Sequence, residues 1–549
     1  MKRLPAFFKR HMESLKPGMG GEEQGATNTR FYNQRSTPYN GKRIWLRWAA
    51  VVAGVWTIIG LGFLAKQPSV AIADTPKAAA AQVSQGQMIY EQHCAACHGL
   101  DGDGAGPGAE RLFTKPRDFT RDEYEIKSTA GDEFPTRDDL IRTISRGMPG
   151  SSMPAWEGEL SQSEIGAVAD YIQSTFGRFF SQEGYGTTVI DVPGRIDPSE
   201  ESLARGEQLF SSDIGCLKCH GENGRGNGPS AFELTDNTGN IIYPADLTQP
   251  WRFRGGSTPE NIYVRLRTGM PGTPMPSFAD ALSEQDTWDL VNYVLSLSPE
   301  QAPEPAVLLV SQFIEGPLPT EPDDPTWNDI APVYFPISGQ LQRAPRHHQP
   351  AINAVWVKSL YNSSEVAFQV AWNDRTETRE GEAIDAVAIQ FPQDFSGGEE
   401  RPYFVFGDPS RPVYQWYWAA DTDGVTERNA TGLDAIEDQP EAQWQTQDVA
   451  SYQDGRWQVV FRRSLTTNDA NDLNFETDRF MPISFMAWDG FAEESGGSFG
   501  LTTWSNVYLE SPAPLTRYYK IPVVMVVVVI VEGVIVGLVQ RANRKPQRR

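Results

Sequence analysis

The chain has 549 residues, a formal net charge of −23 at pH 7 and only four cysteines. It is too long for a single hydrophobic core, so we expect three or more domains. The first 47 residues hold ten Lys and Arg against three Asp and Glu, and the last nine hold five and none, so residues 48–540 carry −35. That acidic bulk excludes nucleic-acid binding, because it would repel phosphate.

Two apolar stretches lie next to the basic ends of the chain. Residues 44–65 and 521–540 each contain about twenty residues with one charged side chain, Arg47 or Glu532. A helix of that length crosses the hydrocarbon layer of a membrane. We therefore expect two transmembrane helices, at 44–65 and 520–540, with basic cytoplasmic tails at 1–43 and 541–549.

The positive charge at both ends predicts the orientation of these spans. Cytoplasmic flanks are rich in Lys and Arg, so we expect the bulk of the chain on the periplasmic side of the inner membrane. The first stretch has a second interpretation, a signal peptide cleaved after Ala71–Ala73, although its long basic leader favours an uncleaved anchor. For Glu532, a neutral carboxyl hydrogen-bonded to a partner helix is preferred to a proton relay.

All four cysteines belong to two C-x-x-C-H motifs that lie 122 residues apart: Cys94, Cys97 and His98, then Cys216, Cys219 and His220. A disulfide framework scatters its cysteines, and a structural zinc site places two pairs close together. In a C-x-x-C-H segment the thiols add to the vinyl groups of haem and the histidine binds the iron. The motifs therefore predict two covalently attached haem c groups.

The motifs are part of an internal repeat. The same offset of 122 residues aligns segment 147–150 with 269–272, and Tyr171 with Tyr293. One duplicated unit of about 100 residues explains the match. Helical spacing of apolar residues, and a serine followed by an acid at the start of 161–176 and of 283–297, predict that both units are all-α.

Residues 83–300 resemble two class I cytochrome c domains of the kind with a G-M-P-G-x-x-M-P-x-aromatic loop. The resemblance implies that a methionine sulfur of this loop is the sixth iron ligand, and it points to Met153 and Met275. Met148 and Met270 are the alternative ligands, and otherwise pack against the haem edge. Ligation by His and Met closes both axial positions, which suits electron transfer rather than substrate reduction.

Three cations precede the helices that lead into the methionine loops: Lys127, Arg252 and Arg254. They are candidates to pair with haem propionates through charge-assisted hydrogen bonds. Solvated surface charges are the equally good alternative.

From residue 301 the character of the chain changes. A linker rich in Pro and acidic residues, 301–345, leads into short runs of Val, Phe and Trp that alternate with polar residues. Such runs, separated by Gly, Asn and Asp, predict an all-β sandwich at 346–512. The expected fold is multidomain, with two all-α cytochrome c domains at 83–180 and 196–300, a linker at 66–82, this sandwich and two transmembrane helices.

The pieces VAWND, AVAIQFP, FGDPSRPVYQWYW and FMAWDG resemble the haem-b domain of the ethylbenzene dehydrogenase gamma-subunit family. The resemblance implies an electron-transfer subunit of periplasmic molybdenum enzymes, such as nitrite oxidoreductase and nitrate, selenate and chlorate reductases. It also implies a haem b held by a Met and a Lys. Here the methionine position is Phe406, and the Gly-rich stretch 496–504, where the lysine is expected, has none.

The usual haem b ligands are therefore missing. Lys358 is the only lysine between 301 and 519 and falls in an early predicted strand. His347-His348 is a candidate replacement pair, but a surface loop explains it better. We expect this domain to bind no haem b and to serve as a docking platform.

The expected function is that of a membrane-anchored dihaem cytochrome, an electron-transfer subunit rather than an enzyme. It would work between a periplasmic redox enzyme of the molybdenum nitrite or nitrate type and a respiratory-chain partner. The alternative is a cytochrome subunit of a quinol-oxidising or oxygen-reducing membrane complex, with the β-domain as a docking or ligand-binding module. Both units have complete methionine loops, which disfavours a dihaem peroxidase. The acidic bulk favours a small basic cytochrome c as a soluble partner.

Overall fold

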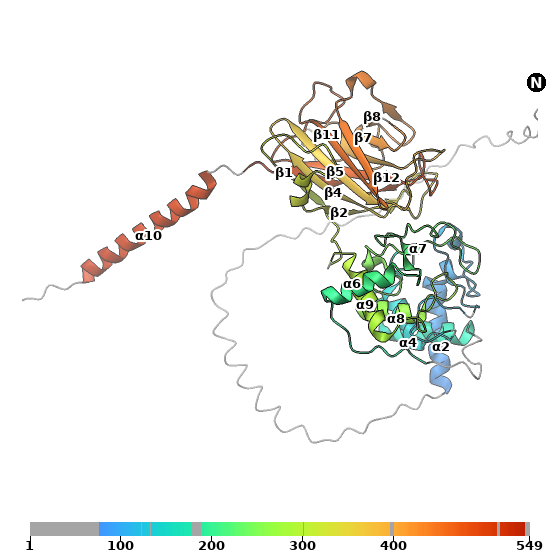
Figure 1. The fold of residues 1–549 in the computed structure, drawn as a ribbon. Coiled ribbons are helices and arrows are strands. Elements are labelled where there is room, and N and C mark those ends of the chain that lie inside the picture. The colour runs from blue at the N-terminus through green and yellow to red at the C-terminus, as the bar shows by residue number, and fades with distance from the viewer. Residues whose placement is uncertain are drawn as a thin grey trace, which may run out of the picture. The chain divides into compact units, whose positions relative to one another are not determined.

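The computed structural model describes residues 76–121, 123–131, 133–177, 188–299, 301–395, 400–422, 424–512 and 516–543 (Figure 1). The described residues all belong to one compact unit, Asp74–Arg549. The predicted tail at 1–43 and the predicted span at 44–65 lie outside the described residues.

The predicted two spans and the inner-membrane location need correction. Helix α10 (Thr516–Asn543) contains the second apolar stretch, yet none of the described helices is both long enough and apolar enough to cross a membrane. The helix takes in polar residues at both ends, and Glu532 interrupts its valine-rich middle with an ionisable carboxyl. Two spans, and the membrane location inferred from them, are therefore wrong for the part of the chain that the structure describes.

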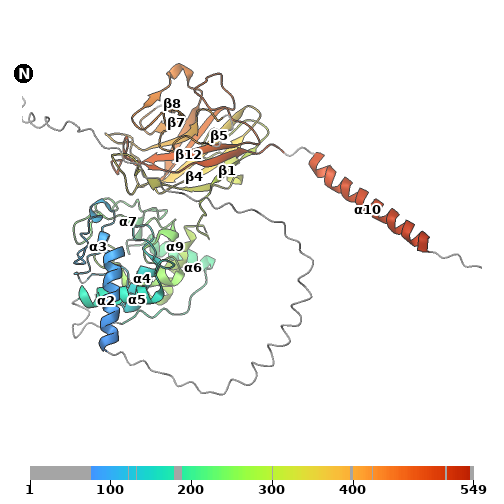
Figure 2. The same ribbon diagram turned by 180° about the vertical axis from the view of Figure 1, so that it is seen from behind.

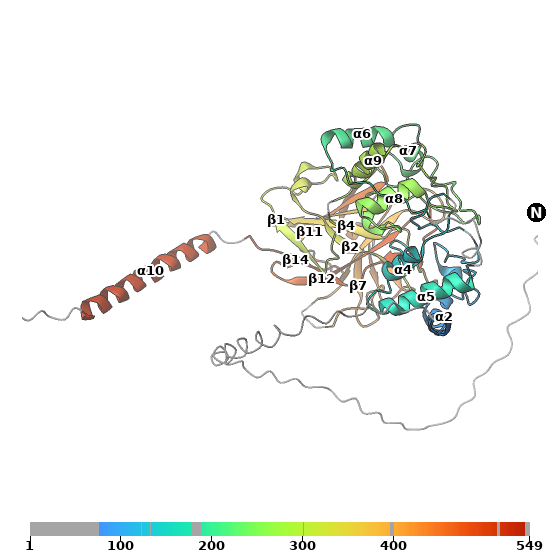
Figure 3. The same cartoon turned by 90° about the horizontal axis from the view of Figure 1, so that it is seen from below.

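In the residues described, the first helical domain contains four α-helices and one short 3₁₀ turn. They are α2 (Pro76–His93), α3 (Ala95–His98), η2 (Ala109–Arg111), α4 (Arg137–Arg146) and α5 (Gln162–Thr175). Tyr90 of α2 and the apolar face of α5, which includes Ile165 and Val168, are fully buried in its core. Figure 3 shows α2, α4 and α5 grouped together.

The second helical domain repeats this order. Its elements are α6 (Glu200–Phe210), α7 (Cys216–His220), η3 (Pro250–Arg252), α8 (Pro259–Thr268) and α9 (Glu284–Ser296). Phe210 of α6 meets Trp288 and Val291 of α9 in a shared core. Both units are helical, as the spacing of their apolar residues predicts.

The starts of the last helices also agree with the sequence. Ser161 accepts a hydrogen bond from the backbone N–H of Glu164, and the Glu164 carboxylate accepts one from the Ser161 N–H at 2.8 Å, which completes a capping box for α5. Ser283 caps α9 in the same way by accepting from the N–H of Asp286 at 3.1 Å.

In each unit the first helix crosses the last one at a glycine. A Cβ added to Gly86 of α2 would collide with the carbonyl oxygen of Ala167 in α5, and one added to Gly206 of α6 would collide with that of Asp289 in α9. Only glycine lets the two backbones approach this closely. An aromatic ring follows four residues later in each case, Tyr90 or Phe210.

The strands form one mixed sheet, ordered β10-β11-β5-β4-β1-β14-β12-β6-β7-β8-β9, with β2, β3 and β13 paired beside this path. Strand β1 pairs in parallel with β14 and β4, whereas the other strand pairs are antiparallel. Figure 2 shows β1, β4, β5 and β12 from behind. The strands are β1 (Leu308–Phe313), β2 (Val333–Pro336), β3 (Ser338–Gly339), β4 (Ala354–Tyr361), β5 (Glu365–Asn373), β6 (Ala386–Pro392), β7 (Val413–Ala419), β8 (Thr426–Ala430), β9 (Ile436–Asp438), β10 (Gln447–Gln453), β11 (Arg456–Ser464), β12 (Phe480–Trp488), β13 (Gly500–Leu501) and β14 (Ser505–Leu509).

The two halves of this sheet enclose a single core. The ring centroids of Trp372 in β5 and Trp418 in β7 lie 6.2 Å apart, and those of Phe368 in β5 and Trp416 in β7 lie 5.8 Å apart. Because β5 and β7 are far apart in the strand order, the sheet must curl to bring their inner faces together. The predicted sandwich is therefore corrected to one curled, mixed sheet.

Candidate haem sites

Each predicted iron-binding histidine is oriented by a backbone carbonyl. Nδ1 of His98 lies 3.0 Å from the carbonyl oxygen of Arg117, and Nδ1 of His220 lies 3.0 Å from that of Ala245. Because a carbonyl oxygen only accepts, Nδ1 donates its proton and Nε2 keeps its lone pair for a metal. Burial lowers the pKa of both imidazoles, which favours the neutral form that binds iron.

Sequence reasoning missed these two carbonyls, although a signal for them exists. Arg117 and Ala245 occupy the same place in the segments PRDFT and PADLT, which match between the two units. Two residues after Arg117, the ring of Phe119 stacks on His98 with centroids 4.6 Å apart and an interplanar angle of 19°. The segment therefore holds the imidazole by both a hydrogen bond and a ring contact.

The cysteines lie on the same helical turns as the histidines. Cys94 is the N-cap of α3, which contains Cys97 and His98, and α7 begins at Cys216. Spacings of three and four residues place such side chains on one face of a helix. All four thiols are free, and burial raises the pKa of Cys94 and of Cys216 to about 11, so both are neutral. Two unpaired thiols and one imidazole per turn form a donor set that fits haem c.

The two methionine loops have the same backbone geometry. The N–H of Met148 donates to the carbonyl of Met153 at 3.1 Å, and the N–H of Met270 donates to that of Met275 at 3.0 Å. Each loop begins at a glycine with positive φ, 65° at Gly147 and 64° at Gly269. In both loops a Cβ on that glycine would lie about 2.5 Å from the backbone after the second methionine.

The two methionines of each loop differ in how they pack. Met153 packs against the core of the first helical domain and Met275 against the core of the second. Met148 and Met270 are half-buried and belong to neither core cluster. This arrangement favours Met153 and Met275 as the sulfur atoms that face the haem sites.

The three propionate candidates differ in their surroundings. Lys127 is buried, and its Nζ donates to the carbonyls of Gly131 and Glu133, so backbone groups already engage it. Arg254 pairs with Glu125 at 3.4 Å. For Arg252, burial lowers the pKa of the guanidinium, and the residue keeps its place as a candidate.

Arg117 is a further candidate that the sequence did not single out. Its Nε and Nη2 are buried and have no hydrogen-bond partner, and burial lowers the pKa of its guanidinium. An unsatisfied buried cation is costly, so its donors suit a carboxylate such as a haem propionate. The counterpart in the second unit is Ala245, so the two haem sites differ here.

Among the described residues of the sheet domain, the three candidates for haem b ligation have other surroundings. Phe406 is buried and packs against Phe499 with ring centroids 5.4 Å apart. Nζ of Lys358 donates to the carbonyl of Trp327 at 2.7 Å. His347 forms a 2.8 Å contact with the buried carboxylate of Glu494. Phe406, at the methionine position that the resemblance implies, therefore offers no ligand atom, and Lys358 and His347 already have other partners.

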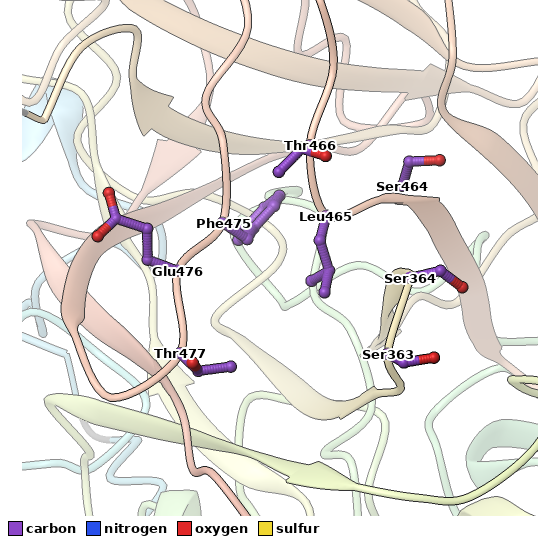
Figure 4. Close-up of a pocket in the computed structure, with 8 residues that line it drawn as sticks. All are labelled: Ser363, Ser364, Ser464, Leu465, Thr466, Phe475, Glu476 and Thr477. Atoms are coloured by element: carbon purple, nitrogen blue, oxygen red, sulfur yellow. The ribbon is translucent and has the colours of Figure 1, made fainter.

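A surface pocket of about 730 Å³ lies beside the start of β5 and the end of β11 (Figure 4). Its lining consists of Ser363, Ser364, Ser464, Leu465, Thr466, Phe475, Glu476 and Thr477. No His, Cys, Met or Lys is among these residues, so the pocket lacks the ligands that haem iron requires.

The family comparisons agree with the duplicated helical architecture. Residues 81–172 match the family described as cytochrome c oxidase, cbb3-type, subunit III, and residues 203–298 match the cytochrome c family. Two cytochrome c domains imply two haem c groups. The molecule is therefore a multihaem c-type cytochrome.

Particular relatives are subunits of redox complexes. A protein named as a respiratory nitrate reductase haem subunit, from Haloferax mediterranei, is 27% identical over 34% of this chain and 67% of its own. The chlorate reductase gamma subunit of Ideonella dechloratans is 30% identical over 26% of this chain and 58% of its own. A cbb3-type cytochrome c oxidase subunit of Azorhizobium caulinodans is 26% identical over 43% of this chain and 66% of its own. The chain thus spans 58–67% of the length of these relatives.

Proposed function

We propose that this chain is a dihaem electron-transfer subunit that works between a redox enzyme outside the cytoplasm and a respiratory-chain partner. The observation that carries the proposal is the repeated helical turn with two free thiols and a histidine whose Nδ1 is held by a backbone carbonyl. Haem c bound there would supply reversible one-electron transfer at iron.

The residues that would hold the two groups follow from the repeat. Thioether bonds would form at Cys94, Cys97, Cys216 and Cys219, and His98 and His220 would each bind iron through Nε2. Met153 and Met275 would supply the opposite ligands, which leaves no axial position open to a substrate.

The domain plan supports a division of labour. We propose cytochrome c domains at 83–180 and 196–300 and an ethylbenzene dehydrogenase gamma-like domain, predicted at 346–512, that lacks haem b and serves for docking. The sheet of this domain also takes in β1, β2 and β3, which precede residue 346. Asn373, at the end of β5, donates to the Asp246 carboxylate at 2.7 Å, and Arg225 donates to the carbonyl of Asp454 at 2.8 Å. Asp246 directly follows Ala245, whose carbonyl orients His220, so the sheet domain contacts the segment beside the second haem site.

The names of two relatives favour a partner of the nitrate or chlorate reductase type. Together with the resemblance of the sheet domain to gamma subunits, they support a molybdenum oxidoreductase as the partner enzyme. The alternative is a cytochrome subunit of an oxygen-reducing complex, which the cbb3-type match of the first domain favours.

Purification of the chain from its native source under gentle conditions tests the choice between these partners. We expect a molybdenum-containing subunit to co-purify in stoichiometric amount. Co-purification with a haem–copper oxidase, and no molybdenum, would reassign the chain to the alternative.

A further inference from the structure

A seam of polar contacts joins the two helical domains. Arg254 of the second domain pairs with Glu125 of the first. Arg265, in the last turn of α8, donates through Nη1 to the carbonyl of Glu125 at 2.8 Å and through Nη2 to that of Lys127 at 3.3 Å. One guanidinium therefore binds two carbonyls of the neighbouring domain, in the fork geometry that Arg provides and Lys does not.

The same guanidinium also holds the start of the second methionine loop. Nη1 of Arg265 donates to the carbonyl of Gly269 at 3.0 Å and to the hydroxyl of Thr268 at 3.1 Å. Gly269 is the positive-φ glycine at which this loop begins, and the next residue, Met270, is tied to Met275 by a backbone hydrogen bond. Any shift of Arg265 would therefore disturb the hydrogen bonds that hold Thr268 and Gly269, where the loop begins.

On the other side of the seam, the contacts continue toward the first methionine loop. Ser128, next to Lys127, donates from both its N–H and its hydroxyl to Asp139 at 3.0 Å. Asp139 and Thr136 form the capping box of α4, a helix that ends at Arg146 and is followed by Gly147, where the first methionine loop begins. A continuous set of hydrogen bonds and one helix thus connects the two loops.

Only the second of the two repeated units has an arginine at this position. The repeat places Thr143 of the first domain opposite Arg265, so the duplication does not require an arginine there. Burial lowers the pKa of Arg265 to about 10, and its Nε is buried without a hydrogen-bond partner. A cation that is costly to bury and that contacts both domains is better explained by the contact it makes than by helix formation.

We propose that Arg265 is a positioning residue that fixes the two methionine loops relative to each other, and so sets the separation of the two haem sites. The proposal rests on the proposed function, because it concerns electron transfer between those sites.

The test compares the full-length variant R265Q with R267Q. Gln keeps one donor for Gly269 but cannot also reach two carbonyls of the other domain. Arg267 lies on the same helix and donates within its own domain, to the carbonyl of Leu282 at 2.7 Å, which makes R267Q the matched control. Two readouts are used: hydrogen–deuterium exchange of peptides covering 125–128 and 269–278, and the rate of electron transfer between the haems after rapid one-electron reduction.

We expect R265Q to keep both haems, to exchange faster in both peptides and to transfer electrons between the haems on the order of tenfold more slowly, an effect of the size that single residues in coupling networks produce. R267Q should match the wild type in both peptides and in rate. If R265Q does not attach both haems, R265K takes its place, with a smaller change of the same sign.

Unchanged exchange and an unchanged rate in a dihaem R265Q would overturn the proposal and leave the proposed function intact. Faster exchange throughout α9 as well would also overturn it, because it would show a general structural role. A wild-type chain without two haems, or without transfer between them, would instead contradict the proposed function.

Discussion

At the residue scale, His98 and His220 show how a backbone carbonyl outside any regular helix or strand can orient a metal-binding side chain. Each ring donates from Nδ1 to a carbonyl that lies 19 or 25 residues further along the chain. This bond fixes both the tautomer and the direction of Nε2 before any iron is bound. The motif identified the histidines, but no spacing rule identifies Arg117 and Ala245 as acceptors, because the segments between are irregular and differ in length.

The choice between the methionines of each loop is testable by substitution with leucine. If Met153 is the ligand, M153L abolishes the sulfur-to-iron charge-transfer band of one oxidised haem and lowers the reduction potential of that haem, because thioether ligation raises it. M148L is the matched control and should keep the band. Loss of the band in M148L, with its retention in M153L, would reverse the assignment.

A cluster of buried carboxyls in the sheet domain predicts a pH dependence of stability. Ligand oxygens of Asp374, Asp385 and Asp489 lie within 4.8 Å of one another. Burial raises the pKa of all three, and repulsion by neighbouring carboxylates adds to the shift at Asp374 and Asp489. The pKa of Asp489 rises to about 7, where Glu494 adds repulsion and Arg375 adds attraction. Unfolded carboxyls lose their protons near pH 4. The folded state therefore binds more protons between about pH 4 and 7, and its stability falls as the pH rises through that window.

The variant D489N should lose less stability than the wild type over this range, because an amide has no proton to release. The difference should be on the order of 1 kcal/mol for each unit of pKa shift removed. Chemical denaturation of the full chain at pH 4, 5.5 and 7 measures it, with the exposed Asp323 changed to Asn as the control. If the stability of wild type and of D489N changed with pH in the same way, the raised pKa of Asp489 would be contradicted.

At the element scale, the helical half of the chain was predictable because its signals are local. Cysteine spacing, the capping serines Ser161 and Ser283 and the apolar periodicity all act within a few residues. The pairing of the strands was not predictable in this way. Leu308 of β1 pairs with Asn506 of β14. The alternation of apolar and polar residues predicts that a segment is a strand, but it does not predict which other strand pairs with it. Helix α10 shows a further limit: the apolar length of 521–540 predicted a span although Glu532 was recognised as a charged residue within it, and none of the described helices is long and apolar enough to cross a membrane.

The crossing of α6 and α9 offers a test at the same scale. G206A places a methyl group against the carbonyl of Asp289, so we expect the helices to separate and the second domain to lose at least the 1–3 kcal/mol that overpacking typically costs. Haem content should fall from two toward one per chain. G194A is the control, since an added Cβ there meets nothing within 4 Å. Two haems in G206A at wild-type stability would refute the crossing geometry.

At the scale of the whole molecule, the large negative charge favours positively charged protein partners. Residues 48–540 carry −35, so a basic soluble cytochrome c would be steered to the chain electrostatically. The rate of electron exchange with such a cytochrome should fall steeply as salt is added, because salt screens the attraction. A rate that does not change with ionic strength would argue against an electrostatically steered partner.

The cofactor count tests the account most directly, because every proposed role depends on it. A pyridine haemochrome spectrum of the purified full-length chain, combined with its protein concentration and intact mass, gives the number and type of haems. We predict two covalently attached haem c groups per chain and no b-type component. A single haem c, or a haem b at stoichiometric level, would contradict the account.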